Sequence, residues 1–435
     1  MAITPVSKSA PVAVSNQPAD NNTAAMCMVA TLFFMWGFVT CLNDILIPHL
    51  KAIFDLSYFQ VMLVQFAFFT GYFIFSLPAG KLVEKIGYQR TMVVGLCTMA
   101  FGAVLFIPAA SVPAYLFFLA ALMIVAAGMT ALQVSANPYV SVLGRPETAS
   151  ARLNLTQALN SFGTFVAPYF GALLILSTTP KSMAEIRQLA PDALQAYRLH
   201  EAATVKIPYL VIAGTLVVLA VAIGLFKLPK IAAIEGGTEA DGSKMKLIQQ
   251  RHLILGVVAI FVYVGAEVSI GSFLVNYFSQ PNIGGLTEKA AALYVPYYWG
   301  AAMVGRFIGS ALLTKLRTGP VLGTAAIVAA LLVTASMLSL GSIAMWTIIA
   351  VGLFNSIMFP SIFTLGIAGL GHLTGEGSGL LIAGIVGGAI IPVIQGALAD
   401  NIGIHHAFIL PVLCYLYIMY YGFRGSRPRG PVVAA

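Results

Sequence analysis

The chain has 435 residues, of which 59% are hydrophobic and only 9% are charged, whereas soluble proteins have about 45–50% and about 25%. So few charges cannot cover a soluble surface, and this composition excludes a soluble globular enzyme, a disordered chain and a disulfide scaffold. The formal net charge of +8 is explained by basic loops on the cytoplasmic side of a membrane rather than by nucleic-acid binding.

Residues 1–25 are predicted to form a disordered tail, because residues 1–24 are polar and lack the apolar core of a cleaved signal peptide. Twelve apolar runs follow, and about 20 apolar residues are enough to cross a bilayer as a helix. We therefore expect an all-α membrane protein with 12 transmembrane helices. The runs occupy residues 26–50, 58–82, 91–110, 114–143, 152–178, 207–228, 252–279, 290–315, 321–341, 343–370, 378–400 and 405–423.

The distribution of basic residues predicts how these helices are oriented. Cytoplasmic loops of membrane proteins are enriched in Lys and Arg. With the N-terminus inside, only six of the 23 basic residues fall in outer loops, so both termini are expected in the cytoplasm. The six outer residues are Lys51, Lys181, Arg187, Arg198, Lys206 and Lys289.

The chain is predicted to contain two helical bundles of six spans each. Residues 229–250, between the sixth and seventh runs, are rich in small and polar side chains and predict a flexible cytoplasmic linker. The N-terminal bundle then covers residues 26–228 and the C-terminal bundle residues 251–424, followed by a tail at 425–435. The outer stretch 179–206 is expected to form a partly helical cap.

The two bundles resemble each other in sequence. Pro, Leu and Gly fall at the same offsets in residues 137–144 of the fourth run and residues 359–366 of the tenth. Parallel repeats of six spans build the major facilitator fold, in which the substrate site lies near the middle of the membrane at the seam between the bundles.

The segment from residue 80 to residue 90 resembles the signature loop of the major facilitator superfamily, with a small residue, an acid, bases and glycines in the same order. We interpret it as a conformational latch, in which the acid pairs with nearby bases and the pairs break as the bundles rock. The alternative is an ordinary charged cytoplasmic loop. The predicted latch residues are Gly80, Glu84, Lys85, Gly87 and Arg90.

Two carboxylates lie inside predicted spans, Asp44 in the first and Glu267 in the seventh. An ionisable residue in a span costs about 2.5–3.5 kcal/mol on insertion scales, so it indicates a functional site. The two occupy corresponding spans of the bundles and are predicted to face the central cavity, where they bind a cation, a proton or sugar hydroxyls. The alternative for each is a structural hydrogen bond. Arg306 and Asp400 are expected to be structural charges near span ends.

Amide side chains complete the predicted site. Gln133 and Asn137 share one helix face, and Gln157 and Asn160 share another. Amides and carboxylates both suit sugar hydroxyls, which donate and accept hydrogen bonds; the alternative is that such residues hold helices together, at about 0.6 kcal/mol each. The predicted substrate-binding residues are Asn43, Asp44, Gln133, Asn137, Gln157, Asn160, Glu267, Asn276, Tyr298, Asn355 and Gln395, with Asp44 and Glu267 also coupling the cation.

The sequence lacks the motifs that are typical of several kinds of chemistry. The sequence has no phosphate-binding loop of the Gly-x-x-x-x-Gly-Lys-Ser/Thr type, no His/Cys cluster with metal spacing and no Ser/His/Asp arrangement. We therefore expect no direct use of ATP, no cofactor, no metal site and no enzymatic activity. This argues against a membrane-embedded enzyme, and the missing soluble signalling domain argues against a receptor-like sensor.

Four stretches, residues 32–38, 42–48, 135–140 and 152–163, resemble the fucose permease family of sugar–cation symporters, and within it the bacterial glucose/galactose transporters. The resemblance implies that Asp44 binds sugar or helps proton coupling. It also implies that Asn43, Gln157 and Asn160 contact the sugar. The fucose permease has a glutamate where this chain has Gln133 and a glutamine where it has Glu267, so the coupling scheme is expected to differ.

These observations predict a multi-pass protein of the inner membrane that imports a hexose of the glucose/galactose class with H+ or Na+ by alternating access. Its partners are then the sugar, the cation and the lipid bilayer, without nucleic acid, and we expect a monomer. An uncoupled sugar uniporter and an exporter of another small organic solute are the alternatives in the same fold.

Overall fold

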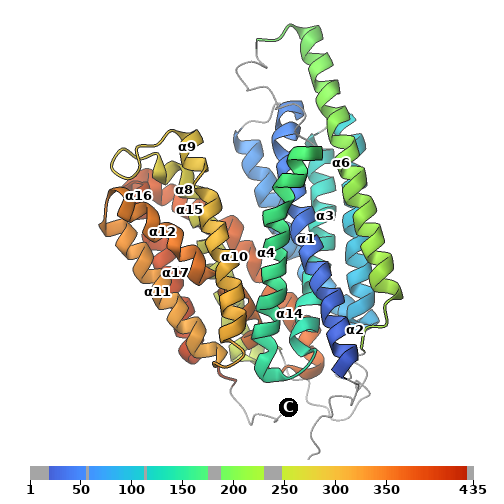
Figure 1. Ribbon diagram of the computed structural model, residues 1–435, viewed down its shortest axis with the longest axis vertical. Coiled ribbons are helices and arrows are strands. Elements are labelled where there is room, and N and C mark those ends of the chain that lie inside the picture. The colour runs from blue at the N-terminus through green and yellow to red at the C-terminus, as the bar shows by residue number, and fades with distance from the viewer. Residues whose placement is uncertain (1–18, 55–57, 112–114, 175–187, 230–246, 429–435) are drawn as a thin grey trace, which may run out of the picture.

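A computed structural model describes residues 19–54, 58–111, 115–174, 188–229 and 247–428. These residues are helical and include no strand, and their helices form two lobes (Figure 1). The first lobe contains α1 (Ala19–Phe54), α2 (Tyr58–Ser111), α3 (Tyr115–Val142), η1 (Pro146–Thr148), α4 (Ala149–Leu174) and α6 (Pro191–Leu225).

The second lobe is built from shorter helices. Its main elements are α8 (Arg251–Phe278), α10 (Val295–Leu312), α11 (Thr318–Leu338), α12 (Gly341–Asn355), α13 (Met358–Ile367), α14 (Thr374–Ala383), α15 (Gly387–Ile402) and α17 (Ile409–Tyr420). Shorter turns between them are η2 (Leu247–Gln249), α9 (Glu288–Ala292), η3 (Gly371–Leu373), η4 (Gly384–Val386), α16 (Ile404–Ala407) and η5 (Tyr421–Gly425).

The apolar composition places large hydrophobic side chains on the outside as well as in the core. Phe73, Val218 and Leu331, for example, are more than half exposed, as expected where lipid replaces water. Nine stretches of the described residues are long and apolar enough to cross a membrane. The number of 12 stays a prediction, because one of the nine, Phe66–Ala109, contains two predicted spans, and α4 and α10 are not among them.

The predicted loop after the second span is a bend within a helix. α2 continues on both sides of Gly87, which alone departs from helical geometry, with φ at 81° and ψ at 169°. Glycine adopts a positive φ at little cost because it has no Cβ atom. The charged residues between 80 and 90 suggested a longer break than the single residue that the turn requires.

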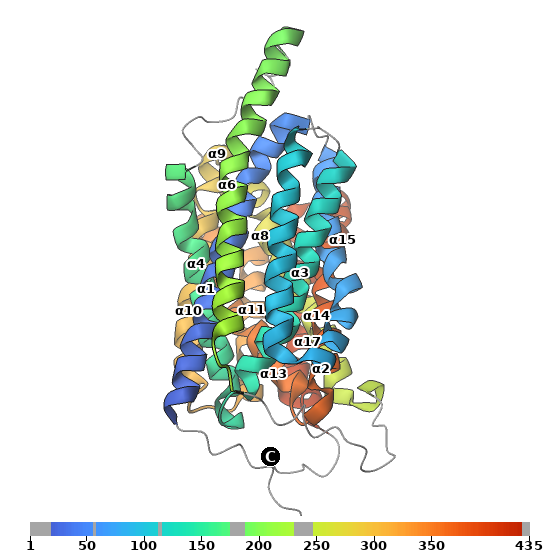
Figure 2. The same cartoon turned by 90° about the vertical axis from the view of Figure 1, so that its right-hand side faces the viewer.

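The predicted outer cap joins the sixth span in one helix. α6 begins at Pro191, a residue favoured in the first turn, and continues through Pro208 to Leu225. It projects beyond the rest of the molecule (Figures 1 and 2). The remainder of the predicted cap before residue 188, the linker residues 230–246 and the tails 1–18 and 429–435 lie outside the described residues.

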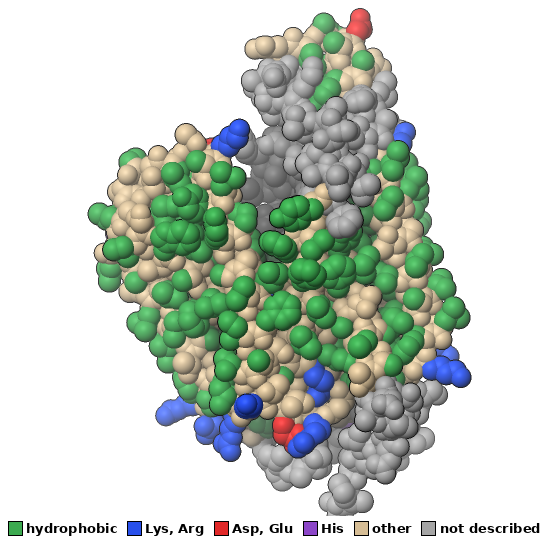
Figure 3. All heavy atoms as spheres, in the orientation of Figure 1, with side chains coloured by type: hydrophobic (Ala, Val, Ile, Leu, Met, Phe, Trp, Pro, Cys, Tyr) green, Lys and Arg blue, Asp and Glu red, His purple; other side chains and the backbone are tan. Residues whose placement is uncertain are grey.

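The lobes meet mainly along two helix pairs, α4 with α10 and α2 with α14. They touch at the end of the molecule where the described chain ends, after η5, and diverge toward the other end, where the surface is hollowed between them (Figures 1 and 3). Most of the Lys and Arg side chains visible in Figure 3 gather at the closed end. The seam between α4 and α10 therefore runs from the closed end into the hollow.

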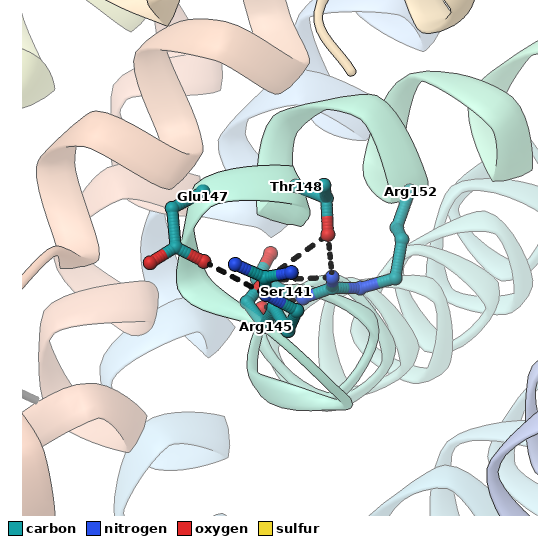
Figure 4. Close-up of polar contacts among 5 residues, drawn as sticks. All are labelled: Ser141, Arg145, Glu147, Thr148 and Arg152. Atoms are coloured by element: carbon teal, nitrogen blue, oxygen red, sulfur yellow. Dashed lines mark hydrogen bonds and ion pairs between the residues drawn. The ribbon is translucent and has the colours of Figure 1, made fainter. Parts of the chain in front are cut away.

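Arg152 ties α4 to the end of α3 (Figure 4). Its guanidinium donates hydrogen bonds to the carbonyls of Val140 (3.1 Å), Ser141 (2.7 Å) and Arg145 (2.8 Å), and to Oγ1 of Thr148 (2.6 Å). The last carbonyls of a helix have no partner within it, and the five donors of an arginine suit such a cluster of acceptors. Arg152 thereby fixes where α4 starts relative to α3.

Candidate functional site

The second lobe contains a buried polar cluster around Glu267. Glu267 lies on α8 one turn after Tyr263, with Tyr298 on α10, Asn355 at the end of α12 and Tyr415 on α17. The Nδ2 atom of Asn355 donates to the hydroxyl of Tyr298 at 2.7 Å, and both residues have no exposed surface. The cluster therefore brings together three predicted site residues from three helices.

Several polar atoms of this cluster have no hydrogen-bond partner among the described residues. They are Oε1 of Glu267, Oδ1 of Asn355 and the hydroxyls of Tyr263 and Tyr415. Buried polar groups in folded proteins are almost always paired with protein or water, so such a group needs an explanation. A hydroxylated or cationic ligand, or water in its absence, would supply the missing partners.

The first lobe contains a second cluster, made of amides on α3 and α4. The Nε2 atom of Gln133 donates to the hydroxyl of Tyr72 on α2 at 3.0 Å, and Nε2 of Gln157 approaches Oδ1 of Asn137 at 3.4 Å. Gln133, Asn137 and Gln157 are each less than 9% exposed. Three predicted residues thus lie together, and Nδ2 of Asn137 remains without a partner there.

Asn160 is engaged in helix packing in this structure. Its Nδ2 atom donates to the carbonyl of Phe33 on α1 at 2.9 Å, which is the helix-holding role that the sequence left open as an alternative. Contact with sugar stays a prediction for Asn160. Its neighbour Ser161 faces the other lobe instead.

Two other predicted residues stand apart from both clusters. Asn276 is exposed near the end of α8, and Gln395 is fully buried in α15. Neither amide atom of Gln395 has a hydrogen-bond partner among the described residues. Asn43 and Asp44 belong to α1, but their side chains lie outside the described part of the chain, so their roles stay predictions.

Arg306 makes a contact between the lobes that the sequence did not predict. It was expected to be a structural charge near a span end, yet it lies inside α10 and reaches the first lobe. Its Nη1 atom donates to Oγ of Ser161 on α4, and its Nε atom donates to the carbonyl of Ser356 at 3.3 Å. Its positive charge also acts on Glu267. The available signal was its charge between Gly305 and Gly309 in an apolar run.

The predicted latch segment has a different arrangement from the one expected. Lys85 and Arg90 are exposed, and neither forms an ion pair with Glu84 within the described residues. Glu84 is half-buried and faces another acid, Glu376 on α14 of the second lobe. Its Oε1 atom has no hydrogen-bond partner there. The latch role of the segment stays a prediction.

Glycines bring the two lobes together beside Glu84. A Cβ atom on Gly80 would lie 2.9 Å from the carbonyl oxygen of Gly375, and one on Gly379 would lie 2.7 Å from that of Ser76. Real Cβ atoms do not approach so closely, so larger residues would push α2 and α14 apart. Gly80 and Gly379 therefore allow α2 and α14 to pack closely at this crossing.

Comparison with known proteins places the chain in a family. The sequence profile of the Major Facilitator Superfamily matches residues 26–385. A glucose/galactose transporter of Brucella abortus biovar 1 is 52% identical over 417 residues, which cover 96% of this chain and 98% of that protein. The L-fucose-proton symporter of Escherichia coli K12 is 36% identical over 397 residues, which cover 90% of each chain.

Solved structures agree with this assignment. The crystal structure of the transporter FucP in the outward conformation matches with a TM-score of 0.87 and 35% sequence identity, covering 92% of this chain and 98% of that one. The chain is accordingly a multi-pass protein of the inner membrane and a transporter rather than an enzyme. Its profile match, its relatives and its fold agree that it belongs to the Major Facilitator Superfamily.

Proposed function

We propose that the protein imports a hexose of the glucose/galactose class together with a cation, by alternating access of its two lobes. The names of the relatives support this proposal: one is a glucose/galactose transporter and another an L-fucose-proton symporter. The second name favours H+ over Na+ as the coupling cation. An uncoupled uniporter and an exporter of another organic solute are the alternatives.

One observation carries the proposal: Arg306 links the two lobes across the seam, close to the polar cluster of each. The charge of Arg306 acts on Glu267, and its guanidinium donates to Ser161 of the other lobe. The hydroxyl of Ser161 donates in turn to the carbonyl of Gln157 at 3.1 Å. Midplane sites at the seam between repeats are typical of secondary transporters.

The chemistry of the clusters suits a sugar. Asn355 and Asn137 each keep one amide atom without a partner, an acceptor in the first and a donor in the second. A sugar hydroxyl satisfies either kind of group. In this proposal Asn355, Tyr298 and Glu267 bind from one lobe, and Gln133, Asn137 and Gln157 bind from the other. Asn43, Asp44, Asn160, Asn276 and Gln395 are proposed as further contacts in other states of the cycle.

The proposed orientation follows from charge. Because basic residues are enriched on the cytoplasmic side of membrane proteins, we place the closed end, where Lys and Arg gather (Figure 3), in the cytoplasm. Both termini are then cytoplasmic, and the hollow opens outward. In this state the protein accepts sugar and cation from outside.

The test is uptake of labelled glucose, galactose and fucose into proteoliposomes that contain the purified protein. An inward proton gradient, an inward sodium gradient and no gradient are imposed separately. Import coupled to protons predicts that acidic outer medium drives glucose or galactose above its equilibrium level, and that a protonophore abolishes this accumulation. The matched control is the protein-free liposome under the same gradients.

Each other outcome contradicts part of the proposal. Equilibration of sugar without accumulation under either gradient would identify a uniporter. Accumulation under the sodium gradient alone would show that Na+, and not H+, is the coupling cation. If none of the three sugars enters faster than into empty liposomes, the hexose assignment is wrong.

A further inference from the structure

Arg306 is held firmly by its own lobe. The glycines on either side, Gly305 and Gly309, leave no room for a Cβ atom against Leu353 and Ile357 of the neighbouring helices. Its Nε atom also donates to the Ser356 carbonyl at 3.3 Å. The backbone of α10 at Arg306 therefore moves with the second lobe when the lobes rock.

Ser161 belongs to the other lobe, so its contact with Arg306 depends on how the lobes are placed. It lies near the middle of α4, on the seam with α10. Farther along the same seam, the hydroxyl of Ser310 donates to the carbonyl of Ala151 at 2.9 Å. Opening of the closed end separates α4 from α10, and Arg306 then loses Ser161.

Glu267 shares a lobe with Arg306, and rocking does not carry the two apart. Within the described residues they form no ion pair in the present state, and Oε1 of Glu267 has no hydrogen-bond partner. Among the described residues, the other ionisable groups that act on the carboxylate are the hydroxyls of Tyr263, Tyr298 and Tyr415. Arg306 is the cation whose charge acts on it.

An unpaired charge in a low-dielectric interior is costly. Pairing with a nearby carboxylate is therefore energetically favourable for a guanidinium that has lost Ser161. We infer that Arg306 is a positioning residue that alternates between two partners: Ser161 of the other lobe in the present state, and Glu267 once the closed end opens. This inference rests on the proposed function, because it assigns to Arg306 the release of the coupling cation.

The exchange of partners gives direction to the transport cycle. While Arg306 is held by Ser161, Glu267 is available for a cation that enters through the hollow. When the seam opens, the Arg306 guanidinium replaces that cation on Glu267, and the proton or Na+ leaves to the water on the newly opened side. With H+ as the cation, the O–H bond of the Glu267 carboxyl breaks, its electron pair stays on the carboxylate, and water accepts the proton. With Na+, only the coordination to the carboxylate is lost.

The experiment compares Ser161→Ala, Ser310→Ala, Arg306→Gln and wild type in proteoliposomes. Readouts are net sugar uptake, sugar counterflow, and the concentration of coupling cation that half-saturates uptake. Ser161→Ala frees Arg306 to pair with Glu267 before the seam opens. Because a neighbouring opposite charge changes the proton affinity of a carboxylate by about tenfold or more, half-saturation is expected at about tenfold higher cation concentration.

Ser310→Ala is the matched control. It removes a hydrogen bond between the same two helices, but one that does not involve Arg306, and it should leave the half-saturating concentration unchanged. Arg306→Gln is expected to lose net uptake while counterflow persists, because counterflow does not require the cation to leave Glu267. Ser161→Ala keeps the inference open to test if Arg306→Gln does not fold.

Two outcomes overturn the inference alone: an unchanged half-saturating concentration in Ser161→Ala, or an equal change in Ser310→Ala. Normal net uptake by a folded Arg306→Gln protein would also overturn it. A wild-type protein whose sugar uptake does not depend on any cation would overturn both this inference and the proposed function, so the two failures are distinguishable.

Discussion

At the scale of single residues, the site depends on hydrogen bonds between groups that have no contact with water. Tyr298 and Asn355 illustrate this, since neither side chain is exposed and each is the other's partner. Leaving a buried polar group without its partner costs about 1–3 kcal/mol. Such pairs stabilise the second lobe and also set the position of the free Oδ1 atom of Asn355.

Tyr298→Phe should therefore destabilise the protein by about 1–3 kcal/mol and weaken sugar binding, because both amide atoms of Asn355 are then unpaired. The measurement is the apparent melting temperature in detergent together with KM for sugar uptake. Tyr297→Phe is the control, since this neighbour of Tyr298 is exposed and lies outside the polar cluster. Equal losses in the two variants would contradict the role of the pair.

Sequence chemistry alone identified much of this site. Glu267, Tyr298 and Asn355 are polar residues inside apolar runs. Because such residues cost free energy in a membrane, the sequence predicts a function for them, and the structure brings them together. Arg306 was not identified in this way. Hydropathy alone extended its predicted span to residue 315, which placed Arg306 near the span end, where a structural charge is expected. Its partner Ser161 lies 145 positions away in the sequence, and no local pattern predicts such a contact.

At the scale of helices, glycines decide how closely elements approach. The sequence singled out Gly80 as a latch residue but not its partners at the crossing, Gly375 and Gly379 on α14. Helix identity was predictable from apolar runs, whereas boundaries were not. The single positive φ at Gly87 and the continuous α6 show that local composition does not specify where one helix ends.

Gly379→Leu should separate α2 from α14 at the closed end, because even its Cβ atom would lie 2.7 Å from the carbonyl oxygen of Ser76. Overpacking costs roughly 1–3 kcal/mol, which changes the ratio of two states by about 5- to 150-fold. Spin labels at positions 147 and 315, on the two lobes, would report a longer distance between them.

Gly214→Leu on α6 is the control for the overpacking by Gly379→Leu. A Cβ atom there meets nothing within 4 Å, so the distance between the labels should not change. If Gly379→Leu leaves the distance distribution as in wild type, the α2–α14 crossing does not hold the lobes together.

The connection between α3 and α4 gives a second prediction at this scale. Arg152→Lys keeps the charge but loses the fork of donors that reaches four oxygen atoms. Hydrogen bonds to charged groups contribute about 1.5–3 kcal/mol each, so a clearly lower melting temperature is expected. Arg145→Lys is the comparison, because its ion pair with Glu147 is exposed, and a loss as large as that of Arg152→Lys would contradict the account.

At the scale of the whole molecule, the structure represents one end state of a two-lobe transporter, closed where the basic residues gather and open opposite (Figures 1 and 3). The internal repeat and the composition predicted two helical bundles, but not which state they adopt. That choice depends on contacts across the seam, including Arg306 with Ser161 and Gly80 with Gly375. Such contacts join residues from different repeats and give no periodic pattern in the sequence.

In the proposed cycle, Glu267 couples sugar movement to a cation. The most direct measurement compares Glu267→Gln with wild type in proteoliposomes, using accumulation of labelled glucose or galactose under an inward proton gradient and counterflow without a gradient. Glu267→Gln should lose accumulation and retain counterflow, because an amide still accepts hydrogen bonds but cannot take up and release a proton. Accumulation as in wild type would contradict it.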